Sequence, residues 1–271
     1  MTSTMKRMSP LNAMLGTLVA IVSAIVVVVV IRRRRTAIDI GPATGFVAGA
    51  YALVLSLLLV AVITHFDEAR YAVLTEVTTS AAVFENAEAF PTAQRIAVQH
   101  DVVCLLRSTI TEEWPTISDG NLEGSPVTWQ RQWRLNATLA EVGNTPVSEQ
   151  EVFKQASAKL EERNEARIKR LYEGQTLMNA AQWIVLWVGA FLVIVLVGLE
   201  LNIRDKPVWF GIFGMLILSI AILLTGIAVI DSPYQGVWRV TPKPIEAALG
   251  VMQGMPSSNE AFRPCAPIAV P

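Results

Sequence analysis

Four long stretches of the 271-residue chain contain no Asp, Glu, Lys or Arg, and this pattern constrains the fold more than any other feature. Each stretch is apolar and longer than the roughly 20 helical residues needed to cross a hydrocarbon core of about 30 Å. Charged residues make up 17% of the chain, against about 25% in a typical soluble domain. The sequence therefore predicts four transmembrane helices, in the windows 8–31, 40–66, 174–199 and 207–230.

The first apolar stretch follows Lys6 and Arg7, which is also how a secretory signal peptide begins. The apolar region of a signal peptide is about 7–15 residues long and leads to a small-residue cleavage site. Here the apolar run reaches Ile31 and stops at the arginines 32–35, whose charges resist entry into hydrocarbon. We therefore interpret the stretch as a retained transmembrane helix.

The segment between the second and third apolar stretches differs sharply from them. It carries 17 acidic and 11 basic residues, and its apolar side chains recur at helical spacing. The expected fold is an all-α membrane protein, with four transmembrane helices and a helical extramembrane domain between the second and third. The expected divisions are 1–66 (N-terminal tail and first two helices), 67–173 (helical domain), 174–230 (last two helices) and 231–271 (C-terminal segment and flexible tail).

Within the helical domain, Pro91 is expected to end one helix and start another, since proline fits a first helical turn. That second helix is expected to end at Glu113–Pro115. The charged stretch 160–173 is interpreted as a solvated or helix-packing face, with a binding surface as the alternative. We expect its helix to run without a break into the third transmembrane helix.

Several function classes are disfavoured by what the sequence contains. A net charge of −1 and a pI of 6.2 argue against nucleic-acid binding. The sequence has no glycine-rich phosphate loop, no HExxH and no CxxC, so we predict no enzyme, no cofactor and no metal site. The four apolar stretches contain no ionisable Asp, Glu, Lys or Arg in mid-span, which disfavours a proton- or sodium-coupled transporter.

The second apolar stretch carries small and polar residues near one helical face: Gly45, Gly49, Ser56 and Thr64. One interpretation is the lining of a pore. The other is close helix packing, because Gly-x-x-x-Gly allows two helices to approach. The sequence leaves both interpretations open. In the last two stretches, Trp183, Trp187 and Trp209 are interpreted as anchors at the membrane–water interface.

Positive residues near the ends of transmembrane helices favour the cytoplasm. Six lie in the two short loops on one side, at 32–35, 204 and 206, and four lie on the other, at 6, 7, 239 and 243. We therefore predict that the helical domain and both termini face outside. Cys104 and Cys265 then share an oxidising compartment that permits a disulfide. The alternative is a buried Cys104 and a free Cys265 thiol.

Four segments together resemble the bacterial bestrophin-like domain family of unknown function. They are GFVAGAYALVLSLLLVAV, DEARYAVLTEVTTSAAVF, STITEEWP and DSPYQGVWRVTP, and the resemblance covers about residues 40–245. Through it, six residues fall on recurrent family positions: Glu76, Glu113, Trp114, Asp231, Pro233 and Gly236. By analogy of topology, the resemblance implies a homo-oligomeric channel.

Two hypotheses about function follow. The first is a homo-oligomeric ion channel in the plasma membrane, with the second transmembrane helix lining the pore. The second is a non-conducting membrane scaffold or accessory subunit whose acidic helical domain docks a partner protein. The expected partners are the lipid bilayer, further copies of this chain and, under the second hypothesis, that docked protein, but not nucleic acid.

Overall fold

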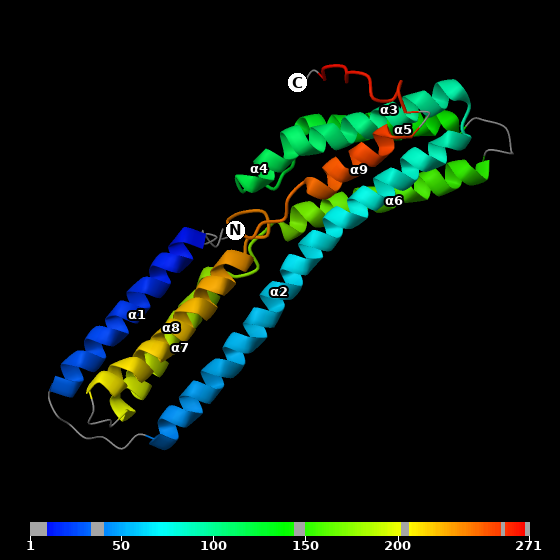
Figure 1. Ribbon diagram of the computed structural model, residues 1–271. Coiled ribbons are helices and arrows are strands. Elements are labelled where there is room, and N and C mark those ends of the chain that lie inside the picture. The colour runs from blue at the N-terminus through cyan, green and yellow to red at the C-terminus, as the bar shows by residue number, and fades with distance from the viewer. Residues whose placement is uncertain (1–9, 34–40, 144–149, 202–205, 256–257, 269–271) are drawn as a thin grey trace, which may run out of the picture. The chain divides into compact units, whose positions relative to one another are not determined.

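The computed structural model describes residues 10–33, 41–143, 150–201, 206–255 and 258–268, which form helices, turns and loops but no strand (Figure 1). Four of the helices are long and apolar enough to cross a membrane, which confirms the predicted number of spans. The elements are α1 (Pro10–Arg33), α2 (Gly41–Asn86), the 3-10 helix η1 (Ala87–Ala89), α3 (Thr92–Ser108), the π-helix η2 (Thr109–Glu113), α4 (Trp114–Ser118), α5 (Pro126–Val142), α6 (Gln150–Glu173), α7 (Ala180–Glu200), α8 (Lys206–Ile230) and α9 (Lys243–Gln253).

The chain divides into two compact units. The membrane unit contains residues 1–66, 176–232 and 236–238. The helical unit contains residues 67–175, 233–235 and 239–271. Helix α2 belongs to both, because it continues without a break from its apolar first half into its amphipathic second half.

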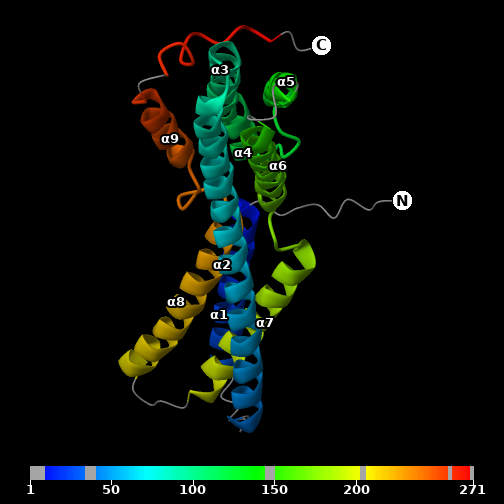
Figure 2. The same cartoon turned by 90° about the vertical axis from the view of Figure 1, so that its right-hand side faces the viewer.

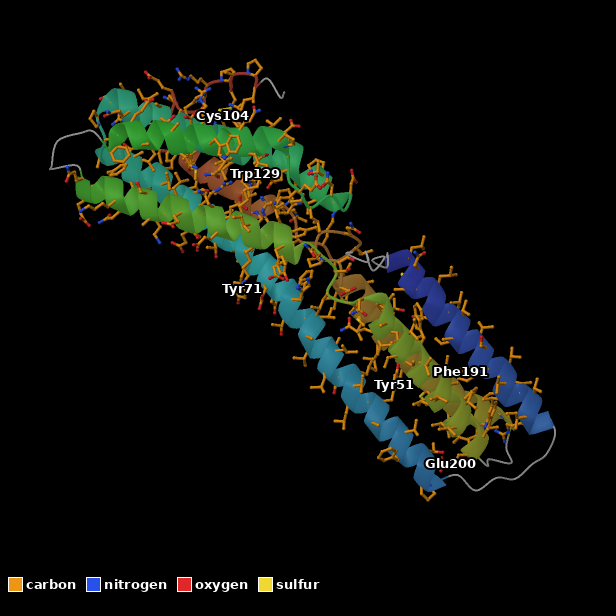
Figure 3. The ribbon with its side chains drawn as sticks, turned by 180° about the vertical axis from the view of Figure 1, so that it is seen from behind. Tyr51, Tyr71, Cys104, Trp129, Phe191 and Glu200 are labelled. Atoms are coloured by element: carbon orange, nitrogen blue, oxygen red, sulfur yellow. A yellow bond between two sulfur atoms is a disulfide. The ribbon has the colours of Figure 1, made fainter. Side chains whose placement is uncertain are left out.

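In the membrane unit, α1 lies along α7 and α8 in both views (Figures 1 and 2). Glycines allow this close approach, because a Cβ added at Gly16 would lie 2.2 Å from the indole of Trp187. The same indole donates its N–H to the Thr17 hydroxyl at 3.2 Å. Helix α2 joins the core through one face, with Tyr51 packed against Gly189 of α7 (Figure 3).

The tryptophans predicted as interfacial anchors pack against the core of the membrane unit. Trp183 and Trp209 are only 1% and 7% exposed, and Trp187 is half-buried against the same core. Trp209 stacks on Phe213 at 4.8 Å and lies under the Arg32 guanidinium at 4.4 Å. These side chains face neighbouring helices, and their position at the membrane–water interface stays a prediction.

The helical unit is built around α3, which packs against α5. Helix α3 does not end at Glu113–Pro115 as expected. It passes through the π-helical turn η2 into α4, which reaches Ser118. Pro115 is the second residue of α4 and directly follows the π-helical turn. The buried apolar core includes Val73, Phe84, Val98, Val102, Leu105, Leu106, Ile117, Leu135, Leu139 and Leu160.

The chain also breaks between α6 and α7, so the expected continuous helix is wrong. Helix α6 ends at Glu173, and α7 begins after Asn179. Asn179 and Gln182 form a reciprocal capping box that satisfies the first N–H groups of α7. Of the positive residues that predicted the orientation, Lys6, Arg7, Arg34, Arg35 and Arg204 lie outside the described residues.

Candidate functional site: an open face of α2 and a buried carboxylate network

Gly45, Gly49, Ser56 and Thr64 all lie on the exposed side of α2 in the membrane unit. A Cβ added at either glycine would meet nothing within 4 Å. The core-facing side of the helix is instead formed by residues such as Leu55 and Val62. The two glycines therefore do not pack against another described helix of the same chain, and this face is open to a partner molecule.

Large apolar side chains occupy the same open side of α2. Phe46, Leu53 and Val60 recur every seven residues and are 77%, 67% and 62% exposed. Ser56 adds a hydroxyl, which donates to the Leu53 carbonyl oxygen at 2.9 Å. The face is thus a hydrophobic surface with a few polar atoms. Sequence reasoning identified its small residues and missed the apolar stripe beside them.

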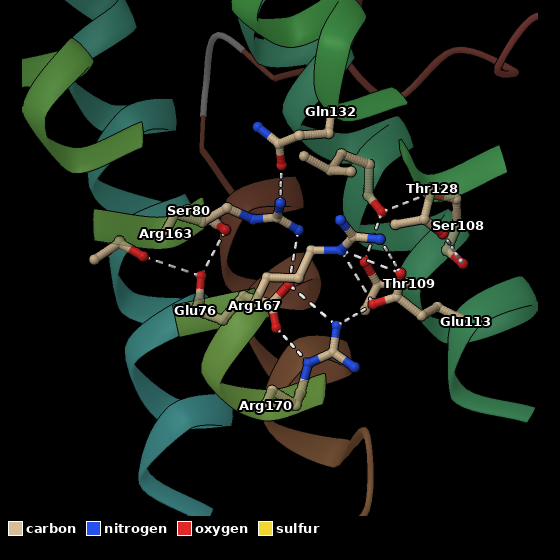
Figure 4. Close-up of polar contacts among 12 residues, drawn as sticks. Glu76, Ser80, Ser108, Thr109, Glu113, Thr128, Gln132, Arg163, Arg167 and Arg170 are labelled. Carbon is tan, nitrogen blue, oxygen red and sulfur yellow. Dashed lines mark hydrogen bonds and ion pairs between the residues drawn. The ribbon is translucent and has the colours of Figure 1, made fainter. Parts of the chain in front are cut away.

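In the helical unit, two glutamates from the family positions are completely buried and meet the same arginine (Figure 4). Arg170 donates from Nε to Glu76 Oε2 at 2.6 Å and from Nη2 to Glu113 Oε1. Arg163 binds the other oxygen of Glu76 at 2.7 Å. Arg167 binds Glu113 through both Nε and Nη2. These five residues, here called the carboxylate network, join α2, η2 and α6.

The three arginines were missed because the charged stretch 160–173 was interpreted as a solvated or helix-packing face, with a binding surface as the alternative, and no buried ion pair was considered. The signal was present, since Arg163, Arg167 and Arg170 have the spacing i, i+4 and i+7 that places them on one helical face. All three are 0–1% exposed, whereas Glu162 and Lys169 on the same helix are exposed. Lys169 instead pairs with Glu68 of α2 at 3.6 Å.

The field of the arginines keeps Glu113 ionised. Burial alone raises the pKa of this carboxyl, but the charge of Arg170 and the hydrogen bonds and charge of Arg167 lower the pKa to about 2. Burial also lowers the pKa of Arg163 to about 10, in spite of the opposing field of Glu76. The pKa of Arg170 is raised: burial lowers it, but Glu76 and Glu113 outweigh burial.

Aromatic rings cover the network. The Arg167 guanidinium lies 3.9 Å from the ring centroid of Trp129, and Arg170 lies 5.3 Å from that of Trp114. Trp114 in turn makes an edge-to-face contact with Tyr234 at 5.6 Å. Three family positions, Glu76, Glu113 and Trp114, therefore converge here, and Pro233 is buried next to Tyr234 in the same unit.

The remaining family positions, Asp231 and Gly236, belong to the membrane unit. Asp231 is 3% exposed, follows the last residue of α8 and accepts the Met178 backbone N–H at 3.0 Å. Burial raises the pKa of Asp231 to about 6, although the Met178 N–H and the charge of His65 oppose the rise. Gly236 has φ +81°, a conformation that side-chain-bearing residues rarely adopt.

Cys104 on α3 and Cys265 in the C-terminal segment form a disulfide, with their Cα atoms 5.7 Å apart (Figure 3). The segment is also held through its carbonyl oxygens. The Arg107 guanidinium donates to the carbonyl oxygens of Phe262 and Arg263 at 3.3 and 3.2 Å. The His100 Nδ1 lies 2.9 Å from the carbonyl oxygen of Ala261. A segment expected to be a flexible tail is therefore tied to the helical unit.

Comparison with known proteins agrees with this architecture. Residues 14–245 match the family model of the Bestrophin-like domain. The fold resembles the crystal structure of a mutant of a bacterial Bestrophin homolog from Klebsiella pneumoniae, with a TM-score of 0.65 over 90% of this chain and 100% of that chain. The two sequences are 13% identical. No curated protein matches the chain significantly.

Proposed function

We propose that this chain, which belongs to the Bestrophin-like domain family, forms a homo-oligomeric ion channel in which α2 lines the pore. Membership of the family supports a channel protein in a membrane. The proposal that α2 lines a pore rests on the open side of this helix. There the small and polar residues lie away from the core of their own chain: Gly45, Gly49, Ser56 and Thr64. A ring of copies would turn these sides toward a common axis.

The chemistry of that side also fits a conduction path. Exposed Phe46, Leu53 and Val60 would form apolar rings, and the hydroxyls of Ser56 and Thr64 would supply polar contacts between them. Apolar constrictions in pores gate by wetting and dewetting. The proposal assigns no enzymatic reaction to the chain.

The test is current through the purified protein in planar bilayers. Ser56→Trp places a large ring on the open side of α2 and is expected to reduce the current at least five-fold. The matched control is Ser219→Trp, because Ser219 is also an exposed serine in a membrane-spanning helix, α8, with its hydroxyl bound to a backbone carbonyl. Silent bilayers across voltage, pH and calcium, or equal effects of both variants, would contradict a pore along α2.

The mass of the purified complex in detergent separates this proposal from its alternative, the scaffold whose acidic helical unit docks a partner protein. A closed ring of identical copies supports the pore. A stable complex of one copy with a different protein supports the scaffold.

We also propose that the helical unit lies outside the cytoplasm. The disulfide between Cys104 and Cys265 supports this orientation, since such bonds persist in oxidising compartments. Maleimide labelling of denatured protein, prepared without reductant, is expected to modify no thiol until a reductant is added. Protease added to intact spheroplasts is expected to cut the helical unit. Two reactive thiols from the start, together with full protection from protease, would reverse the orientation.

A further inference from the structure

The turn that follows α8 exposes two large apolar side chains. Val237 is 87% exposed and Trp238 is 63% exposed, directly after the positive-φ residue Gly236. This is the reverse of Trp183 and Trp209, which the structure buries. Large apolar side chains are unfavourable in water, so the turn favours an apolar environment.

A groove lies between this turn and the outer side of α8. Its volume is about 440 Å³, within the range of roughly 300–1,000 Å³ typical of small-molecule sites. Gly226 opens the groove, because a Cβ added there would meet nothing within 4 Å. The turn contributes Val237 and Trp238, and the helix contributes Ala221, Ile222, Thr225, Gly226 and Val229.

The lining identifies the chemistry of the occupant. It contains no charged side chain, and its only side-chain polar atoms are the Thr225 hydroxyl and the Trp238 indole N–H. Helix α8 is long and apolar enough to cross a membrane, and in a membrane hydrocarbon would be the solvent along its outer side. The turn begins directly after Ile230, the last residue of α8, and Gly236 lies six residues beyond that helix end. Tryptophan prefers this depth, because its ring is apolar and its N–H reaches polar headgroups.

We propose that the groove binds one acyl chain of a membrane phospholipid, with Trp238 covering the chain at the level of the headgroups. The small residues Ala221 and Gly226 provide the space for the chain. The turn at Gly236 directs Val237 and Trp238 into the lipid. This lipid site stands independently of ion conduction, because it lies on α8 rather than on the open side of α2.

Two measurements test the site. In the first, Val237→Cys is labelled with a bimane fluorophore, which is selective because the two native cysteines are bonded to each other. In vesicles of brominated phosphatidylcholine, we expect at least a two-fold loss of bimane fluorescence, and little quenching by aqueous iodide. Strong iodide quenching with no bromine effect would place the turn in water and overturn the proposal.

The second measurement uses a phosphatidylcholine that carries a photoreactive group on one acyl chain. The wild-type protein should be labelled within residues 221–238, and Gly226→Leu, which fills the groove, should reduce that labelling at least five-fold. Gly211→Leu is the matched control, because Gly211 is equally open on the same helix but lies outside the groove. Equal labelling of all three proteins would overturn the proposal. Loss of oligomer mass in Gly226→Leu without lipid labelling of the wild type would instead assign the groove to a second copy.

Discussion

Each unit of this protein contains a buried carboxyl group with a shifted pKa, and the two net shifts have opposite signs. In the helical unit, Glu113 meets two arginines, and its pKa is lowered to about 2. In the membrane unit, burial raises the pKa of Asp231 to about 6, although a backbone N–H and the charge of His65 oppose the rise. Desolvation acts in the same direction on both. The partner that the fold supplies determines the sign of the net shift.

The contrast extends to how each unit is held together. The helical unit joins three elements through buried ion pairs, whose guanidinium and carboxylate side chains are 0–1% exposed. The described core of the membrane unit is apolar and relies on close approach at Gly16 and Gly189. We therefore expect changes of charge to damage the helical unit most, and changes of volume to damage the membrane unit.

The largest effect is expected from Glu113→Gln. The substitution leaves Arg167 and Arg170 buried with one carboxylate partner removed, which typically costs about 3–5 kcal/mol. Unfolding of the purified protein in detergent measures the loss. Glu68→Gln is the control, because Glu68 pairs with the half-exposed Lys169 and such pairs contribute about 0–1 kcal/mol. Equal losses in the two variants would show that burial does not distinguish these ion pairs.

A smaller loss is expected from Gly189→Ala in the membrane unit. The new Cβ would lie 2.4 Å from the ring of Tyr51, and overpacking of this kind costs about 1–3 kcal/mol. The same substitution at Gly214 is the control, since a Cβ there meets nothing within 4 Å. Thermal unfolding should shift for the first variant only. An unchanged Gly189→Ala protein would mean that α2 moves away from α7 at little cost.

The smallest effect is expected from Asp231→Asn and concerns pH. The pKa of Asp231 is raised above its ordinary value of 3.8, so the folded state binds the proton more tightly than the unfolded chain does. Its contribution to stability is therefore present at low pH and is lost as the pH rises toward about 6. Asn does not titrate, so it removes this dependence of the unfolding free energy on pH. The variant should be more stable than the wild type at pH 7 by about 1 kcal/mol.

The contribution of Glu113 to stability should depend on pH in the opposite direction from that of Asp231. Its lowered pKa means that its contribution is present above pH 4.5 and is lost as the pH falls toward about 2. Unfolding midpoints between pH 2 and pH 8 should therefore show two regions of opposite slope. If the unfolding midpoint of Asp231→Asn still falls between pH 4 and pH 6, a group other than Asp231 causes that fall.

Resemblance to a family identified some of the important positions but not their partners. Glu76, Glu113 and Trp114 were singled out in advance, and the structure places all three at the carboxylate network. The sequence around Arg163, Arg167 and Arg170 looks like an ordinary charged helix face. Periodicity shows that these side chains share a face, but it does not say whether that face meets water or two buried glutamates.

The sequence by itself determined the four transmembrane helices, because the cost of placing charge in hydrocarbon is a property of composition and length. Only the tertiary structure decided which side of each helix is buried: it turned Trp183 and Trp209 inward, left Trp238 exposed, and aligned Cys104 with Cys265 across 161 residues of sequence. These outcomes depend on contacts between segments far apart in the chain. The local pattern of residues does not identify which of those segments come into contact.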